Sequence, residues 1–209
     1  MELQFYGANC VRISTKKASL TIDDNLSQYG LKSPVKADDI LINTFDNGAT
    51  PVSGYKIAIG GPGEYEVSGV TIQGIAARSH MDEKGKHSAT IYRLVLEDVR
   101  IAIVGHIYPD LSNIQLEAIG VIDMLIVPVG GNGYTLDALG ALKIIKSIDP
   151  KVVIPTHYAD DAINYEVPQS PLDEAIKTFA LEPHETMSKL KLKGSEFGET
   201  TKLVVLERQ

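Results

Sequence analysis

The sequence has little of several features that would direct it to a particular environment or partner. Its 209 residues include one cysteine, Cys10, so the chain can form no internal disulfide and no cysteine-rich zinc or iron–sulfur site. Twenty basic residues against 27 acidic ones give a net charge of −7, which argues against nucleic acid or anionic lipid as the main partner. No apolar run approaches the ~18 residues of a membrane span, and the first residues lack the pattern of a secretory signal. We therefore expect a cytoplasmic protein that takes a small molecule as its partner, as a monomer or an oligomer, with Cys10 as a buried, unreactive thiol.

The composition is typical of a globular protein with a large core. Hydrophobic residues make up 44% of the chain and charged residues 22%, without a linker, repeat or low-complexity segment, so we predict one domain over residues 1–209. The first hundred residues contain short runs with strand composition, and the expected strands are 3–6, 11–14, 19–23, 40–43, 55–60, 65–67, 70–75, 89–96 and 99–104. The last two should form a hairpin that turns at Glu97 and Asp98.

From residue 110 onward, predicted helices and strands alternate. Ser112 and Gln115 stand at capping-box spacing and predict a helix start. Thr135 is expected to cap a second helix, and Pro171 to take the first position of a third. The second helix is expected because apolar residues recur at helical spacing at Leu136, Leu139, Leu142, Ile145 and Ile148. Strand patterns occur at 123–129, 152–154, 189–193 and 203–206, so the whole predicts an α/β fold with the sheets inside and the helices outside.

Three of the five histidines follow predicted strands directly. They are His80, His106 and His157. Ligands and catalytic groups in layered α/β folds gather in the crevice outside the strand ends, so these imidazoles could hold one metal ion with an open position for water. The alternative is that each is only a polar residue at the start of a loop.

Several blocks of the sequence, in register, resemble one family. Residues 62–70 read PGEYEVSGV, residues 123–131 read DMLIVPVGG, and residues 150–158 read PKVVIPTHY. Together with the opening strands and the acidic pair Asp23 and Asp24, they are similar to the metallo-β-lactamase superfamily, in the branch of metal-dependent hydrolases related to ascorbate-6-phosphate lactonase. This resemblance implies an αββα sandwich with a metal cleft along one edge.

The family's main metal-binding motif is incomplete in this chain. Family members carry His-x-His-x-Asp-His after the strand that corresponds to residues 40–42. Read without gaps, Thr44 and Asp46 stand at the first two histidines, and Gly48 and Ala49 stand at the Asp-His pair. A shift of two residues would place Asp46 and Asn47 on that pair, still without a histidine. The resemblance therefore predicts a degenerate motif, in which Asp46 alone keeps ligating chemistry.

The remaining ligand positions of the family are all histidine here. By the resemblance, His80 and His157 match family ligands, whereas His106 replaces the aspartate that bridges two metal ions. A carboxylate can bridge two cations, but a neutral imidazole offers one lone pair to one metal. One hypothesis is a single zinc, manganese or iron ion on these histidines, with Asp46 as a further ligand or as general base, in a hydrolase of an ester, lactone or phosphoester. The other is a protein without a metal that works as a ligand-binding, regulatory or assembly module.

Three further residues are expected to line the cleft on the substrate side. Gly131 belongs to a glycine-rich turn before a predicted helix N-terminus, where backbone N–H groups favour anions. Tyr134 and Tyr158 stand near the same strand ends. For each of them, ordinary turn or loop packing is the alternative.

Overall fold

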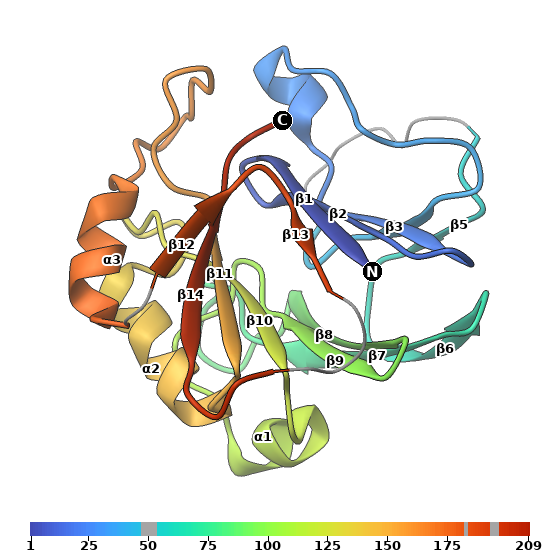
Figure 1. Cartoon of the computed structure of the whole chain (residues 1–209). Coiled ribbons are helices and arrows are strands. Elements are labelled where there is room, and N and C mark those ends of the chain that lie inside the picture. Colours follow the sequence, from blue (N-terminus) through green and yellow to red (C-terminus); the bar gives the residue numbers. More distant parts are fainter. Residues whose placement is uncertain (47–53, 182–183, 193–196) are drawn as a thin grey trace.

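Two β-sheets make up most of the regular structure in the computed structural model, which describes residues 1–46, 54–181, 184–192 and 197–209. The smaller sheet has six strands, in the order β13 (Leu190–Lys191), β1 (Glu2–Gly7), β2 (Cys10–Ser14), β3 (Ser19–Ile22), β4 (Ile40–Ile42) and β5 (Ile57–Ile59). The larger sheet has eight, in the order β12 (His184–Met187), β14 (Lys202–Leu206), β11 (Val152–Thr156), β10 (Met124–Pro128), β9 (Val99–Ile103), β8 (Ala89–Leu96), β7 (Val70–Ala77) and β6 (Gly63–Val67). The two sheets face each other (Figure 1).

The sheets pack because each strand presents apolar side chains to a shared interior. In β1, buried and half-buried residues alternate, and Leu3 and Phe5 point into the core, as the period of two along a strand requires. Strands β4, β10 and β11 are buried along their whole length, as strands covered on both faces are. The main core joins side chains of both sheets, from Leu3 and Val11 in one to Leu94 and Ile126 in the other.

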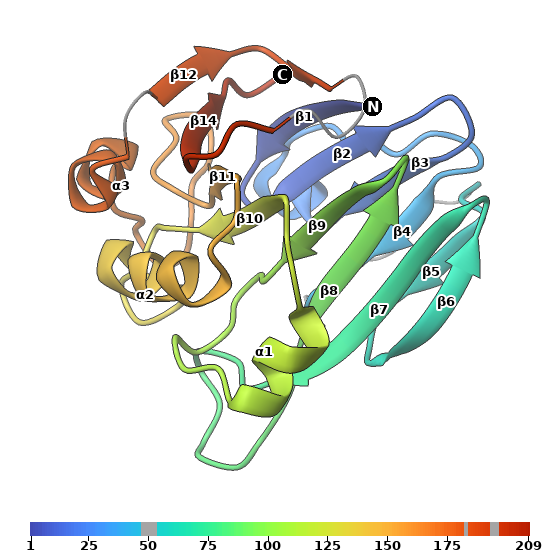
Figure 2. The same ribbon diagram turned by 60° about the horizontal axis from the view of Figure 1, so that its bottom comes forward.

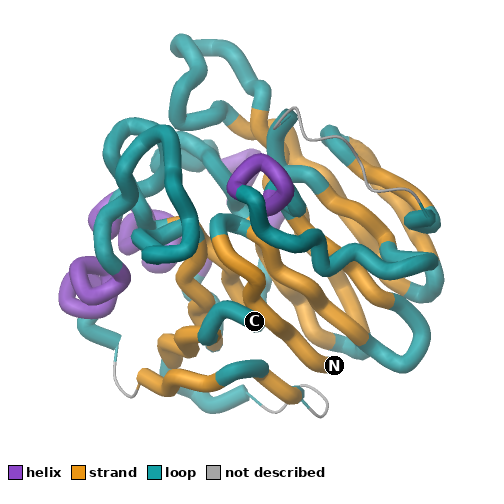
Figure 3. The backbone as a smooth tube through the Cα atoms, turned by 90° about the horizontal axis from the view of Figure 1, so that it is seen from above, coloured by secondary structure: helices purple, strands orange, loops and turns teal. Residues whose placement is uncertain are grey.

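Three α-helices cover the outer face of the larger sheet. They are α1 (Asn113–Ile119), α2 (Ala138–Ile148) and α3 (Leu172–Phe179), and Figure 2 shows them together on that side. A second core, which includes Ile119, Ile144 and Phe179, lies between these helices and the sheet. Most of the helical structure therefore lies to one side of the strands (Figure 3), and a short 3₁₀ helix, η1 (Leu26–Tyr29), follows β3. Of the helices in the described residues, none has the length and apolar character needed to span a membrane.

Most of the expected elements are present, and two details differ. The hairpin of β8 and β9 turns at Glu97 and Asp98, which have φ values of 47° and 66°; positive φ at both central residues is the type I′ geometry that suits strand twist. The expected cap of α2 at Thr135 is wrong, because the Asp137 side chain accepts the hydrogen bond of the Gly140 N–H and caps the helix two residues later. Leu139, expected in the core, is 70% exposed.

Two smaller differences concern the last third of the chain. Pro171 stands at the N-cap position of α3, one residue before the expected place, and supplies no side-chain cap. No strand is expected at β12, which pairs in parallel with β14 at the edge of the larger sheet. Short edge strands carry a weak periodic signal, since one side of their backbone has no partner strand.

A single backbone segment after β4 joins the two sheets beside the site described below. The N–H of Thr90 donates to the carbonyl of Thr44 at 2.7 Å, and Phe45 forms an isolated bridge with Ala89. The side chain of Thr44 also lies against Gly105 after β9; a Cβ atom at Gly105 would stand 2.1 Å from the Thr44 Oγ1. The segment after β4 therefore makes backbone contact with the start of β8 and side-chain contact with the residues after β9.

Candidate functional site

Five polar side chains follow the carboxyl ends of strands that end at the same edge of the sandwich. Asp23 follows β3, Thr44 follows β4, His80 follows β7, His106 follows β9 and His157 follows β11. Strands β3 and β4 are parallel to each other, as are β9, β10 and β11, so their carboxyl ends lie side by side. Crevices outside such strand ends are where layered α/β proteins place their functional groups.

Aromatic and imidazole rings fill the centre of this edge. The ring of His106 has Phe45 at 4.3 Å, Tyr134 at 4.7 Å and His157 at 4.8 Å between centroids, each in an edge-to-face arrangement. His157 in turn lies 5.0 Å from the ring of Tyr165. We call these five residues the ring cluster. Such distances lie within the range of favourable ring pairs, so the cluster is a packed unit.

His157 has an unusual backbone and a fixed ring. Its φ is 50°, a left-handed conformation that costs a residue with a side chain of this size about 1 kcal/mol or more, and its N–H donates to the Ala8 carbonyl at 2.8 Å. The Nδ1 atom lies 3.1 Å from the Gln169 Oε1, an acceptor that favours the tautomer with the proton on Nδ1. Burial lowers the pKa of His157 to about 4, so the ring is neutral at pH 7. In the described part of the chain, its buried Nε2 atom has no hydrogen-bond partner.

His106 is neutral for the same reason. It is 3% exposed, and burial, reinforced by the neighbouring His157, holds its pKa well below the ordinary value. Its Nδ1 atom lies 3.4 Å from the Tyr134 carbonyl. The two neighbouring imidazoles are therefore both uncharged, and neither places a positive charge in the buried site.

His80 reaches the same edge but faces another ring. Its backbone N–H donates to the His106 carbonyl at 2.8 Å, and its ring packs against Tyr108, with centroids 5.8 Å apart. The buried Nδ1 of His80 has no partner in the residues that the structure describes. Asp82 organises the loop that follows, because it accepts hydrogen bonds from the N–H groups of Ser79 and Ser88 and from the Ser88 hydroxyl.

A buried carboxyl group lies beside the position of the degenerate motif. Asp23 is 2% exposed and accepts hydrogen bonds from the N–H and the hydroxyl of Thr44, both at 2.7 Å. Burial raises the pKa of Asp23 to about 7, although the two hydrogen bonds oppose the shift. The carboxyl is therefore divided between its protonated and ionised forms near neutral pH.

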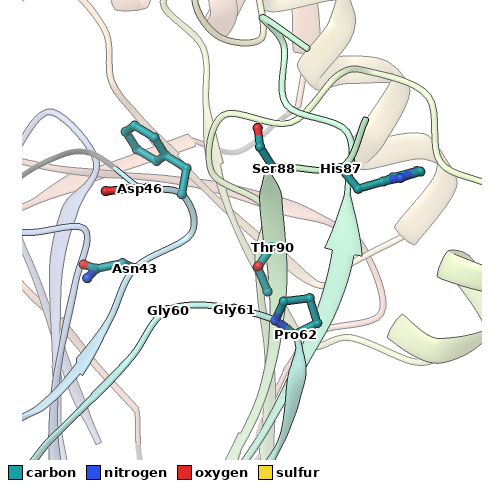
Figure 4. A pocket seen from close by; sticks show the side chains of 9 residues that line it. Asn43, Asp46, Gly60, Gly61, Pro62, His87, Ser88 and Thr90 are labelled. Atoms are coloured by element: carbon teal, nitrogen blue, oxygen red, sulfur yellow. The ribbon is translucent and has the colours of Figure 1, made fainter. Parts of the chain in front are cut away.

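Asp46 lines a pocket that also includes Phe45 of the ring cluster and His87. This cavity of about 400 Å³ is lined by Asp46, Asn43, Ser88 and Thr90, among others. Figure 4 shows Asn43 and Asp46 on one side of the space and Ser88 and Thr90 on the other. The next three motif positions, residues 47–49, lie outside the described residues.

The residues expected on the substrate side have separate places. Tyr134 belongs to the ring cluster, and its role in binding a substrate stays a prediction. Gly131 is buried in a turn, where its N–H donates to the Leu136 carbonyl. The structure does not bring Tyr158 to the cluster, because its ring packs on Phe5 at 5.6 Å within the main core.

Sequence reasoning missed three residues of the site. Phe45 was passed over within the motif, and Tyr165 and Gln169 belong to the irregular loop between β11 and α3. Neither helix nor strand periodicity marks such positions, so no signal in the sequence could have identified the two loop residues. Phe45 could have been identified because it places a large aromatic side chain inside the motif.

The donor atoms of the described residues are not gathered as a two-metal centre would require. Zinc in proteins is held by three or four donors at roughly 2.0–2.3 Å. Within residues 1–46, 54–181, 184–192 and 197–209, no group of three or more His, Cys, Asp or Glu side chains is placed to hold a metal ion. Around His106, two of the three neighbouring rings are Phe45, which has no ligating atom, and Tyr134, which has a hydroxyl.

Comparison with known proteins agrees with this architecture. The model of the β-lactamase superfamily domain matches residues 2–157. A UPF0173 protein of Pyrococcus abyssi is 25% identical over 190 residues, which cover 76% of this chain and 83% of that protein. A UPF0173 metal-dependent hydrolase of Thermococcus onnurineus is 33% identical over 101 residues, 46% of this chain and 44% of that protein.

A solved structure extends the similarity to the whole chain. It belongs to a Thermotoga maritima protein assigned to the metallo-β-lactamase superfamily, and it superposes with a TM-score of 0.78 and 25% identity over 100% of this chain and 99% of that one. The expected fold is thus confirmed, and the relatives include metal-dependent hydrolases. This chain belongs to the metallo-β-lactamase superfamily.

Proposed function

We propose that this member of the superfamily is a small-molecule-binding protein in which the ring cluster stands where a two-metal hydrolase centre would be. The observation that carries the proposal is the packing of Phe45, Tyr134 and His157 around His106, with ring centroids 4.3–4.8 Å away. Of these neighbours, Phe45 has no donor atom for a cation, and Tyr134 offers only a hydroxyl. These contacts therefore favour the second hypothesis from the sequence, a ligand-binding module without a metal, over the single-metal hydrolase.

The contacts of Thr44 support the same conclusion. This residue stands at the first histidine of the family motif, and its backbone and side chain are occupied by Asp23 and by the crossing to Thr90. It is fully buried. At this position the side chain holds Asp23 and the backbone carbonyl joins the two sheets, so Thr44 has a structural use.

Metal content tests the proposal directly. We expect protein purified without chelator or nickel affinity resin to contain less than about 0.1 equivalent of zinc, manganese and iron by mass spectrometry. Added zinc or manganese should not raise the melting temperature, whereas a ligand at a hundred times its Kd would add about 2.7 kcal/mol to the free energy of unfolding. Stoichiometric metal that is lost in both His106→Ala and His157→Ala would contradict the proposal.

A second candidate function is a hydrolase with a single metal ion on His80, His106 and His157, with Asp46 as general base. The observation in its favour is the buried Nε2 of His157, which has no partner among the described residues while Gln169 fixes Nδ1. Metal-binding histidines commonly carry such a hydrogen bond on their other nitrogen. The metal analysis above separates the two candidates, and hydrolysis of a generic phosphodiester or lactone that is lost in His157→Ala would add evidence for this one.

A further inference from the structure

A second cavity opens beside the ring cluster and shares Tyr134 and Tyr165 with it. Its volume is about 460 Å³, within the range of small-molecule sites. Its walls come from η1, from the loop after β10 and from the loop between β11 and α3. Gln169, which bonds His157, is also part of its lining, so the cavity is in direct contact with the candidate site. We call it the tyrosine pocket.

Three aromatic rings form the walls of this pocket. The rings of Tyr29 and Tyr165 meet edge to face, with centroids 5.4 Å apart and planes at 62°. The ring of Tyr165 also contacts the imidazole of His157, and the centroid of the Tyr134 ring lies 5.7 Å from the centroid of that imidazole. The faces of such rings carry partial negative charge, and they attract a cation within about 6 Å of the centroid.

The charge of the pocket has the same sign as the ring faces. Among the described residues that line it, Glu166 is the one charged side chain, and neither lysine nor arginine is present. Burial, and after it the charge of Glu166, raises the pKa of Tyr29. Glu166 also contributes to the raised pKa of Tyr134, behind burial and Tyr29. The field of this carboxylate therefore reaches two of the three rings, and it disfavours an anionic ligand in the pocket.

We propose that the tyrosine pocket binds a small organic cation, an alkylated amine or quaternary ammonium group, between Tyr29, Tyr134 and Tyr165 with Glu166 as its counter-charge. A hard metal ion is a poor fit, because the single carboxylate in the pocket would not replace the water ligands that the ion gives up on binding. An alkylated ammonium group is weakly hydrated and gains from several ring faces at once. The inference rests on the proposed function, since it names the ligand class of the binding protein described above.

The test compares choline with its neutral isostere, 3,3-dimethyl-1-butanol, by calorimetric titration of the full chain in chelator. The two probes have nearly the same shape, so a difference in affinity reports the charge. We expect choline to bind roughly tenfold or more tightly than the alcohol. Equal affinities, or no choline binding at about 10 mM, would overturn the proposal.

Matched variants assign the binding to this pocket. Tyr29→Phe should keep the affinity for choline because it keeps the ring, whereas Tyr29→Leu should lose roughly tenfold. Glu166→Gln should weaken choline and leave the alcohol unchanged, and Glu174→Gln, at an exposed position on α3, should change neither. If Tyr29→Leu does not fold, Glu166→Gln and the two probes still decide the question. Unchanged choline binding in Glu166→Gln and in a folded Tyr29→Leu would contradict the assignment.

The outcome is separable from that of the proposed function. Metal content decides whether a hydrolase centre exists, and the choline titration is done with chelator present. If the protein contains no metal and choline does not bind, the organic cation is refuted as the ligand, and the proposed binding function still stands. Bound metal together with selective choline binding would remove the proposed function and leave the pocket as a cation site.

Discussion

Replacing Asp23 with asparagine should make the protein more stable, and the gain should grow with pH. Asp23 is 2% exposed, and burial raises its pKa to about 7. Asparagine has the same shape, keeps an acceptor for the Thr44 N–H and can donate to the Thr44 hydroxyl. It also tolerates the left-handed φ of 48° at this position better than most residues.

The sign and size follow from proton linkage. An aspartate in the unfolded chain has a pKa of about 3.9, so between about pH 4 and pH 7 the folded state holds a proton that the unfolded state has released. The free energy of unfolding of the wild type therefore falls as pH rises through this window and is level above it. About three pKa units correspond to a loss of about 4 kcal/mol at pH 8, and the loss at pH 5 is about 1.5 kcal/mol. Asp23→Asn has no such charge and avoids this loss.

Urea unfolding at pH 4, 5, 6 and 8 measures the effect, at constant ionic strength and with chelator present. The difference in the free energy of unfolding between Asp23→Asn and wild type should be near zero at pH 4 and rise to several kcal/mol at pH 8. A difference that does not grow with pH, or a variant less stable than wild type at pH 8, would refute the reasoning.

A carboxyl group with the opposite shift provides the control. Burial opposes ionisation of Asp82, but hydrogen bonds from Ser88 and Ser79 outweigh it and lower its pKa to about 2. Its contribution of about 2 kcal/mol is present above about pH 4 and is lost as pH falls through about 2. Asp82→Asn should therefore be less stable than wild type at pH 5 and should converge with it at low pH, the reverse of Asp23→Asn.

One further substitution tests the packing at the site, and another tests a buried ion pair at the amino end of β4. Gly105→Ala should lower the free energy of unfolding by about 3 kcal/mol or more, because φ is +55° and the new Cβ would meet Thr44; Gly85→Ala, at φ +94° in open space, should cost about 1 kcal/mol. Equal losses in urea unfolding would show that the contact is not tight. The Arg12 guanidinium lies 2.6 Å from the carboxylate of Asp39, a residue that is 1% exposed. Arg12→Met would leave this buried charge without its ion-pair partner and should lower the free energy of unfolding by about 3–5 kcal/mol. A decrease below about 1 kcal/mol would disprove a buried, coupled pair.

Much of the fold could be predicted because local sequence and tertiary packing agree. The capping box of Ser112 and Gln115 is present, and α1 ends before Gly120 as expected. The start of α2 could not be predicted from spacing, because Leu136 is fully buried and fits the helical pattern although it precedes the helix. Its burial comes from the turn after β10. Periodicity cannot distinguish a core residue in a turn from one on a helix face.

The site was predictable where it depends on strand ends and unpredictable where it depends on loops. His106 follows β9 and His157 follows β11, the strands that flank β10 in one sheet, and their rings meet. The proximity of Asp23 and Thr44 could also have been predicted, since β3 and β4 are parallel with Ile22 opposite Ile42. Tyr165 reaches the cluster through a loop whose path is set by contacts distant in sequence. Loop positions of this kind have no periodic signal.

The proposed loss of the metal centre is a property of the whole edge and not of single positions. Thr44 is buried against Gly105, and a larger side chain at residue 44 would collide with that backbone and displace Asp23 from its two hydrogen bonds. Phe45 meanwhile occupies the side of His106 that faces the smaller sheet. Restoring one histidine of the family motif would therefore disturb the crossing between the sheets before it supplied a ligand. A sequence that has filled its cleft with rings must change several contacting residues together to bind metal again, because residues in contact do not contribute independently.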